Sequence, residues 1–269
     1  MVGKTRKTRA NRRAYARKSN RVARVSKPLK RAILNITNGH QETKYRAHTL
    51  TNASGSSNIG VFTGFTSGIT GTGEIYSLIP TLNQGDGSFQ RQGVVVFPKK
   101  LRVHLNICST QNNLKNADYM VYAFFLECPQ VKDFANSSAI PITSLMDDGA
   151  GSHTTFDGKS QTSLYTVNRQ AFRVIRVLKK RILYNVPIGP SAGQAAVAQD
   201  PSQDHHSVSL DIPVPKKFVY NTESSAYPNN YAPFFCLGFI DNTWNGDTAP
   251  GATESVQVQA RSELWYKDA

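Results

Sequence analysis

The 269-residue sequence has few cysteines and no long apolar run. No stretch reaches the roughly 18 apolar residues that a transmembrane helix needs, and the N-terminus lacks the apolar region of a secretory signal. The three cysteines, Cys108, Cys128 and Cys236, form no C-x-x-C pair, and each lies within or beside an apolar run. We therefore expect buried, reduced thiols, no disulfide framework and no membrane insertion.

Motifs of catalysis and cofactor binding are also missing. The sequence has no H-E-x-x-H, G-x-S-x-G, Walker loop or dinucleotide fingerprint. Two polar clusters, Asp204-His205-His206 and the acids of "MDDG" (146–149), are interpreted as solvated loop residues, because neither has further ligands at a useful spacing. We predict that the protein is not an enzyme, binds no metal and needs no cofactor.

Acidic residues are absent before Glu42, whereas residues 1–31 hold thirteen Lys or Arg. The whole chain has 32 basic and 18 acidic residues, so the remainder has 32 − 13 = 19 basic against 18 acidic residues. The protein is thus a nearly neutral body with a cationic arm. Such asymmetry indicates a polyanionic partner, either nucleic acid or an anionic membrane. The arm has too few apolar side chains to fold, so we expect it to be disordered.

The arm has the chemistry of a nucleic-acid-binding segment. Each cation that meets a phosphate releases counterions, arginine can bind phosphate through two hydrogen bonds, and Tyr15 can stack on a base. Such contacts read charge rather than base sequence. The same clusters match a nuclear localisation signal. The predicted contact residues are Lys4, Arg6, Lys7, Arg9, Arg12, Arg13, Arg17, Lys18, Arg21, Arg24, Lys27, Lys30 and Arg31.

The body has the pattern of an all-β domain. Residues 101–109 alternate, with Leu101, Val103, Leu105 and Ile107 on one face, which predicts a half-buried strand. Residues 119–126 are apolar on both faces, as in a central strand covered on both sides. A hairpin is predicted at 172–186. Further strands are predicted at 44–52, 58–67, 216–221, 233–241 and 256–266, and a Gly-Asp-Gly turn at 85–87 leads into a strand.

Long polar segments separate these strands. They span 132–168, 187–211, 221–232 and 242–255, are rich in Gly, Pro, Ser, Asn and Asp, and are predicted to be loops. A short helix is predicted to begin near Thr143. Many strands joined by long loops favour a β-sandwich or jelly roll. We expect an arm over 1–41 and one β domain over 42–269.

A smaller set of basic residues lies in the body, where acids are scarce around them. If their strands share one face, the body has a positive side that adjoins the arm; otherwise they are scattered solvated charges. These candidate inner-surface contacts are Lys99, Lys100, Arg102, Arg173, Arg176, Lys179, Lys180, Arg181, Lys216 and Lys217.

Taken in order, several motifs resemble the capsid protein of circular, Rep-encoding single-stranded DNA viruses, the circovirus-like group. They are the Arg-rich N-terminus (4–31), "GDGSFQRQGVVVFPKKLRVHL" (85–105) with its R-x-G step at Arg91 and Gly93, "NRQAFRVIRVLKKRIL" (168–183), "VPKKFVYN" (214–221) and "SELWYKDA" (262–269). The resemblance spans most of the chain, and the order and spacing of the motifs carry it.

The resemblance implies an eight-stranded antiparallel viral jelly roll and self-assembly into a small icosahedral (T=1, 60-copy) shell. It also implies that the arm points inward onto a packaged circular single-stranded DNA genome, that loops face outward, and that a host import receptor carries the protein to the nucleus before it enters the virion. A host-cell attachment factor is left unidentified.

Three alternatives remain open at this point. Polycationic arms also serve jelly-roll capsids of small RNA viruses, and arm charge does not distinguish the two nucleic acids. A cellular nucleic-acid-binding protein with a basic tail is a second alternative, although no known reading module is present. The third is a jelly-roll enzyme or lectin with a localisation arm.

Overall fold

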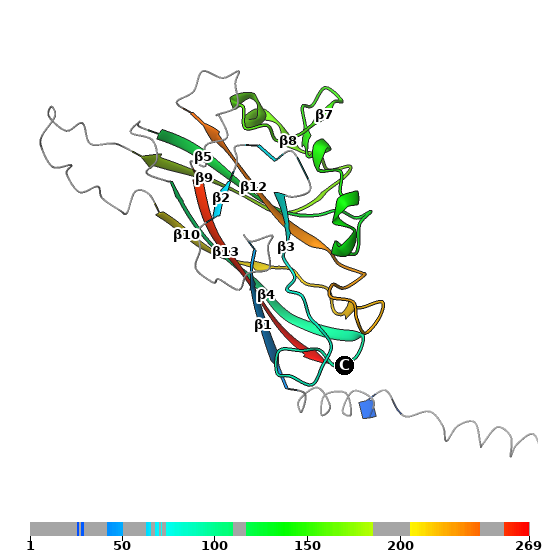
Figure 1. Cartoon of the computed structure of the whole chain (residues 1–269). Coiled ribbons are helices and arrows are strands. Elements are labelled where there is room, and N and C mark those ends of the chain that lie inside the picture. Colours follow the sequence, from blue (N-terminus) through cyan, green and yellow to red (C-terminus); the bar gives the residue numbers. More distant parts are fainter. Residues whose placement is uncertain are drawn as a thin grey trace, which may run out of the picture. The chain divides into compact units, whose positions relative to one another are not determined.

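The fold comes from a computed structural model that describes residues 26, 28–29, 42–50, 63–65, 68–69, 71, 74–109, 117–184, 205–242 and 256–268 (Figure 1). All of its strands belong to one compact unit, Thr43–Ala269. They are β1 (Lys44–Thr49), β2 (Thr63–Phe65), β3 (Ile75–Ser77), β4 (Val95–Ser109), β5 (Ala117–Glu127), β6 (Met146–Asp147), β7 (His153–Thr154), β8 (Thr166–Val167), β9 (Arg173–Tyr184), β10 (His205–Ile212), β11 (Phe218–Val219), β12 (Pro233–Asp241) and β13 (Val256–Asp268).

The strands form two main sheets in which every pairing is antiparallel. The six-stranded sheet has the order β1-β13-β4-β10, with β2 beside β13 and β11 beside β4. The four-stranded sheet has the order β3-β12-β5-β9. A small third sheet, β7-β6-β8, lies within the segment between β5 and β9. The prediction of an all-β fold with antiparallel sheets is therefore confirmed.

The two main sheets share one hydrophobic core. Leu101, Val103, Leu105 and Ile107 of β4 are all buried in it, as the alternation predicted, and alternate residues of β13 and β5 meet them there. Fully burying a side chain of this size contributes about 1.5–3 kcal/mol. The side chains of β4 between these positions, Arg102 among them, lie on the opposite, partly exposed face of the six-stranded sheet.

β5 is buried on both faces, which confirms the second prediction from periodicity. Its outer face carries Tyr122, Phe124 and Leu126, which belong to a second core cluster. The cover comes from the segment between β5 and β9, where Phe156 packs on Phe124 with ring centroids 5.5 Å apart. This segment holds the small sheet and three short 3₁₀ helices, η2 (Phe134–Ala139), η3 (Ile142–Ser144) and η4 (Ser160–Leu164).

Three local predictions are wrong in part. Residues 173–184 form one strand, β9, rather than a hairpin, because Lys179 and Lys180 supply no turn chemistry and pair in register with β5. Segment 187–211 is not all loop, since β10 begins at His205 and pairs with β4. Segment 132–168 folds into the cover described above, and its helix is the 3₁₀ turn Ile142–Ser144.

The R-x-G step has a clear structural basis. Arg91 is fully buried, and its guanidinium donates to the carbonyl oxygens of Leu82, Thr222, Glu223 and Ser225 at 2.7–3.0 Å, and to that of Gly93. Gly93 has a φ of +81°, a conformation that favours glycine. Arg91 thus ties the turn before β4 to the loop after β11.

Among the described residues, no helix is long and apolar enough to span a membrane. The three cysteines are buried free thiols, as predicted. Of the arm, the structure describes only Ser26, Pro28 and Leu29, where the Leu29 N–H lies 3.4 Å from the Ser26 hydroxyl. The expected disorder of the arm remains a prediction, and so does the boundary after residue 41.

Candidate nucleic-acid interface

All thirteen predicted contact residues of the arm lie outside the described residues. The interface can therefore be built only from the body. There, the ten basic residues fall into three groups, on β4, on β9 and between β10 and β11.

The β4 group is gathered by a β-bulge. Trp265 of β13 is opposite Lys100 and Tyr266 is opposite Pro98, so Lys99 is the extra residue. Pro98 and Leu101 are both buried. The bulge therefore places Lys99 and Lys100 side by side on the outer face of the six-stranded sheet, and alternation places Arg102 on the same face.

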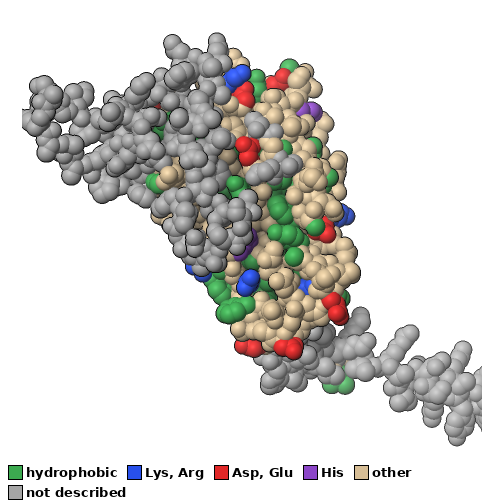
Figure 2. Space-filling model, in the orientation of Figure 1, with side chains coloured by type: hydrophobic (Ala, Val, Ile, Leu, Met, Phe, Trp, Pro, Cys, Tyr) green, Lys and Arg blue, Asp and Glu red, His purple; other side chains and the backbone are tan. Residues whose placement is uncertain are grey.

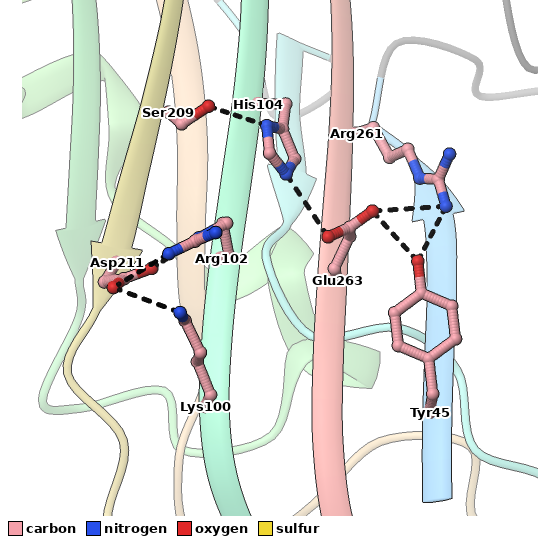
Figure 3. Close-up of polar contacts among 8 residues, drawn as sticks. All are labelled: Tyr45, Lys100, Arg102, His104, Ser209, Asp211, Arg261 and Glu263. Carbon is pink, nitrogen blue, oxygen red and sulfur yellow. Dashed lines mark hydrogen bonds and ion pairs between the residues drawn. The ribbon is translucent and has the colours of Figure 1, made fainter.

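Asp211 of β10 pairs with two of these cations (Figure 3). The Nε of Arg102 donates to its carboxylate at 2.8 Å, and the Nζ of Lys100 lies 3.5 Å from it. The hydrogen bond from Arg102 lowers the pKa of Asp211, and the same hydrogen bond raises the pKa of Arg102. All three side chains are at least one-third exposed, so the pairing adds little to stability.

A second polar network lies beside the first one on the same face (Figure 3). His104 bridges the Ser209 hydroxyl at 2.7 Å and the Glu263 carboxylate at 3.2 Å. The Tyr45 hydroxyl donates to Glu263 at 2.9 Å and accepts from Arg261 at 2.6 Å. Burial acts to raise the pKa of Glu263, but the hydrogen bonds from Tyr45 and His104 and the charge of Arg261 outweigh it, so the pKa is lowered.

A pocket of about 310 Å³ opens within this network. Its lining offers both hydrogen-bond donors and acceptors, and it comes from β1, β4 and β13. The lining residues are Thr49, His104, Asn106, Gln259, Ala260, Arg261 and Glu263. These side chains could therefore hydrogen-bond a ligand that enters the pocket.

Aromatic rings flank the cations at the end of the sheet where β1 begins. Tyr45 and Trp265 are opposite each other on β1 and β13, and their ring centroids are 5.2 Å apart. The Nζ of Lys100 lies 5.7 Å from the Trp265 ring centroid, a cation–π distance. The outer face therefore combines phosphate-binding groups with stacking groups.

The β9 group does not join the β4 group. Lys180 is opposite Val121 and projects to the side of the shared core, whereas Lys179 is opposite Tyr122 and projects to the outer side. Arg181 pairs with Asp118 at 2.6 Å, and Arg173 pairs with Glu127 at 3.3 Å. A regular stretch of strand, such as Lys179–Arg181, sends neighbouring side chains to opposite faces. For β9, the structure therefore fits the alternative of scattered charges better than one shared basic face.

The remaining basic residues are exposed but separate. Arg176 is an exposed residue of β9, and Lys216 and Lys217 lie in the connection between β10 and β11. On the face seen in Figure 2, Lys and Arg side chains stand singly, with acidic side chains among them. Of the ten candidates, only the three on β4 form a cluster on one face.

The two polar clusters of the sequence have structural roles. His205 and His206 begin β10 instead of lying in a loop, so that interpretation is wrong. Asp148 accepts hydrogen bonds from the backbone N–H groups of Ala150 and Ser152, so it is a turn residue as interpreted, whereas Asp147, which accepts from the Gly149 N–H, ends strand β6. Within the described ranges, no group of three or more His, Cys, Asp or Glu is placed to hold a metal ion.

Sequence reasoning missed the partners of the β4 cluster. It placed Arg102 and His104 on the polar side of a strand, but nothing in the sequence says that β13 and β10 are the neighbours of β4. No pattern in the sequence therefore indicates that Tyr45, Arg261 and Trp265 belong to one site. A search of models of protein families gives no match to this chain, and a search of curated protein sequences gives none either.

Proposed function

We propose that this chain is the structural subunit of a small icosahedral virus shell, folded as a viral jelly roll. The order of pairing supports the fold. On the two main paths the strands in chain order are β1, β3, β4, β5, β9, β10, β12 and β13. The first pairs with the eighth, the second with the seventh, the third with the sixth and the fourth with the fifth. Such nesting is what a jelly roll of two Greek keys requires.

The observation that carries the function is the partition of charge. Residues 1–31 hold +13 of the net +14, and the β domain behind them is nearly neutral. A subunit that packs against copies of itself needs a body with little net repulsion, and it needs its polyanion-binding charge on a segment that can extend away from the shell. An enzyme would need neither feature.

The arm is proposed to hold a circular single-stranded DNA genome inside a T=1 shell of 60 copies. Sixty arms at +13 would bring ~800 positive charges inside, a substantial share of the charge on a few thousand phosphates. The choice of DNA rests on the resemblance to circovirus-like capsid proteins. A jelly-roll shell of a small RNA virus is the second candidate, because arm charge favours neither nucleic acid.

The partners follow from this role. The protein would bind itself, the packaged genome and a host nuclear import receptor that reads the arm before assembly hides it. It would be found in the host nucleus during assembly and afterwards in the virion. The attachment factor on the host cell remains to be found.

Electron microscopy of the full chain, expressed alone, tests the proposal. Uniform spherical particles are expected, and nuclease-treated particles should retain nucleic acid. Digestion of the extracted nucleic acid by DNase or by RNase then separates the DNA-virus and RNA-virus readings. Monomers alone across a range of salt and pH would contradict a shell protein and favour a cellular nucleic-acid-binding protein.

Deleting residues 1–31 tests the role of the arm. The expected variant folds but loses retained nucleic acid, and the salt dependence of oligonucleotide binding drops by as much as about nine in log–log slope, since each phosphate contact on single strands contributes roughly 0.7. A matched control keeps the length of the arm and replaces its thirteen cations with Gln. Unchanged binding in either variant would contradict the arm hypothesis.

A further inference from the structure

Trp265 and Tyr45 form an aromatic pair on the outer face of the six-stranded sheet. Trp265 is one of only two tryptophans in the chain, and it stands partly exposed on the outer face of the six-stranded sheet. The hydroxyl of Tyr45 is held between Glu263 and Arg261, which fixes the hydroxyl end of its ring beside Trp265. Part of the order that stacking on this pair requires is thus present before any ligand arrives.

Cations border this aromatic pair. The bulge places Lys99 and Lys100 next to Trp265, and Arg102 follows on the same face. Asp211 is the acid that pairs with Lys100 and Arg102, so these four groups together carry a net charge of +2. Such a surface offers positive charge to phosphates and aromatic rings to planar bases.

We propose that this surface, named here the Trp265 platform (Tyr45, Lys99, Lys100, Arg102 and Trp265), binds unpaired nucleotides. Bases would stack on Tyr45 and Trp265 while the flanking phosphates pair with the cations. The proposal rests on the proposed packaging function and adds to it a second binding site on the body. It selects single strands, because the bases of a duplex are stacked on one another and not available to the rings.

Chain connectivity supports a nucleic acid as the occupant. The cationic arm joins the body at residue 42, and Tyr45 is the second residue of β1. The last cation of the arm, Arg31, precedes Tyr45 by 14 residues, so a strand bound by the arm is tethered within about 50 Å of the platform, at about 3.5 Å per extended residue, which raises its effective concentration there. The cations Lys99, Lys100 and Arg102 beside the two rings favour a polyanion as the occupant of this face.

Photochemical crosslinking of the full chain tests the platform directly. The probe is a 30-nucleotide deoxythymidine oligomer that contains 5-iododeoxyuridine, and crosslinked peptides are identified by mass spectrometry. Adducts at Trp265 and Tyr45 are expected with the single strand and not with a blunt duplex of the same length. The arm should give adducts with both probes.

Binding measurements at about 0.3 M salt, where arm contacts are weakened, give a second test. Trp265→Val should bind the single strand roughly tenfold more weakly and the duplex as well as the wild type, since one base–aromatic stack is lost. Phe89→Val, which removes an aromatic side chain that is 55% exposed elsewhere on the body, is the matched control and should change neither affinity.

The outcomes separate this proposal from the proposed function. Filled particles whose crosslinks fall only within residues 1–41 would overturn the platform and leave the packaging role intact. Crosslinks at Trp265 without any particle formation would support the platform and contradict the shell. Particles free of nucleic acid in which Trp265 is already shielded from acrylamide quenching would assign this face to a second copy of the chain and overturn the platform. If Trp265→Val fails to fold, the crosslinking map of the wild type still decides.

Discussion

The outer faces of the two main sheets differ sharply, although β4 and β5 are consecutive long strands. On β4 the outer face carries Arg102, His104 and Asn106, all partly exposed. On β5 it carries Tyr122 and Phe124, both at least 95% buried. The difference lies in what covers each sheet, since the segment between β5 and β9 packs on the four-stranded sheet and contributes Phe156 to its outer cluster.

This comparison contrasts a face that is packed against other parts of the protein with a face that is open to solvent. The covered face adds a second hydrophobic core. Its aromatic rings are buried, so a ligand cannot reach them. The other face has polar groups that are held in place by one another and still reach solvent, as the pairing of Asp211 with Lys100 and Arg102 shows. Ligand binding is therefore expected on the six-stranded sheet.

The largest contrast should come from truncating one residue on each outer face. Phe124→Ala should lower the free energy of unfolding by about 3–5 kcal/mol, because it opens a cavity between β5 and Phe156. Gln259→Ala removes a partner that accepts a hydrogen bond from Asn106 at 3.0 Å and should cost about 1 kcal/mol or less. Urea unfolding followed by circular dichroism measures both.

Equal losses from the two variants would contradict the comparison. A small effect of Phe124→Ala would mean that the cover does not hold the outer face of β5. A large effect of Gln259→Ala would mean that the polar face is as important for folding as the apolar one.

Much of this fold could be predicted because burial leaves a periodic trace in the sequence. The alternation of 101–109 and the continuous apolar run of 119–126 indicated one covered and one uncovered outer face before any pairing was known. β9 was mistaken for a hairpin because "LKK" interrupts its apolar residues, although no Gly, Pro or Asn supplies a turn. The sequence does not predict β10, because its alternating Val208 and Leu210 follow a polar stretch and fall within the predicted loop 187–211.

The pH dependence of stability should also come from the six-stranded sheet. Burial, reinforced by the charge of Arg46, lowers the pKa of His48 on β1 to about 4, against a hydrogen bond to the Ser77 carbonyl that acts in the other direction. The unfolded chain therefore binds a proton at about pH 6.5 that the folded chain resists until about pH 4. The full contribution of His48 to the free energy of unfolding is present above pH 6.5, and about 2–3 kcal/mol of that free energy should be lost as the pH falls to 4.5.

Two substitutions isolate this effect. His48→Gln keeps a donor for Ser77 and should flatten the stability profile between pH 4.5 and 6.5, as measured by urea unfolding at each pH. His206→Gln is the control. His206 is on the same sheet, and burial and the charge of Lys180 lower its pKa, but by less than the pKa of His48 is lowered. A stability profile that flattens in His206→Gln and not in His48→Gln would assign the pH dependence to His206 and contradict this prediction.

A smaller effect is expected from the polar network itself. Glu263→Gln keeps the shape of the side chain but removes the charge that holds Tyr45, His104 and Arg261, so we expect a loss of about 1–2 kcal/mol. Glu127→Gln is a matched control, since Glu127 pairs with Arg173, a side chain that is 72% exposed, and should cost less than about 0.5 kcal/mol. Thermal unfolding of both variants measures how much each carboxylate contributes to the free energy of unfolding. Equal losses of this free energy would contradict a network centred on Glu263.

The site was less predictable than the fold because it depends on which strands are neighbours. Lys100 and Arg102 were identified from charge alone, but their grouping with Trp265 requires the long-range pairing of β4 with β13 and a bulge at Lys99. The sequence spacing of these residues contains neither fact. Conversely, the five basic residues of β9 are close together in the sequence, which is compatible with a basic patch. In the structure they project to both faces of the strand, and two of them form ion pairs.

The smallest effect on stability, and the clearest on binding, should come from Asp211→Asn. The carboxylate is exposed, so breaking its pairs with Lys100 and Arg102 should leave the unfolding midpoint unchanged within error. The same change frees two cations on the uncovered face and removes one acid, so a single-stranded oligonucleotide should bind roughly two- to threefold more tightly at low salt, and the gain should fade as salt rises. Asp118→Asn frees Arg181 on β9 in the same way but away from the β4 cluster. Equal gains from the two variants, measured by fluorescence anisotropy, would mean that binding responds to total charge and not to the uncovered face.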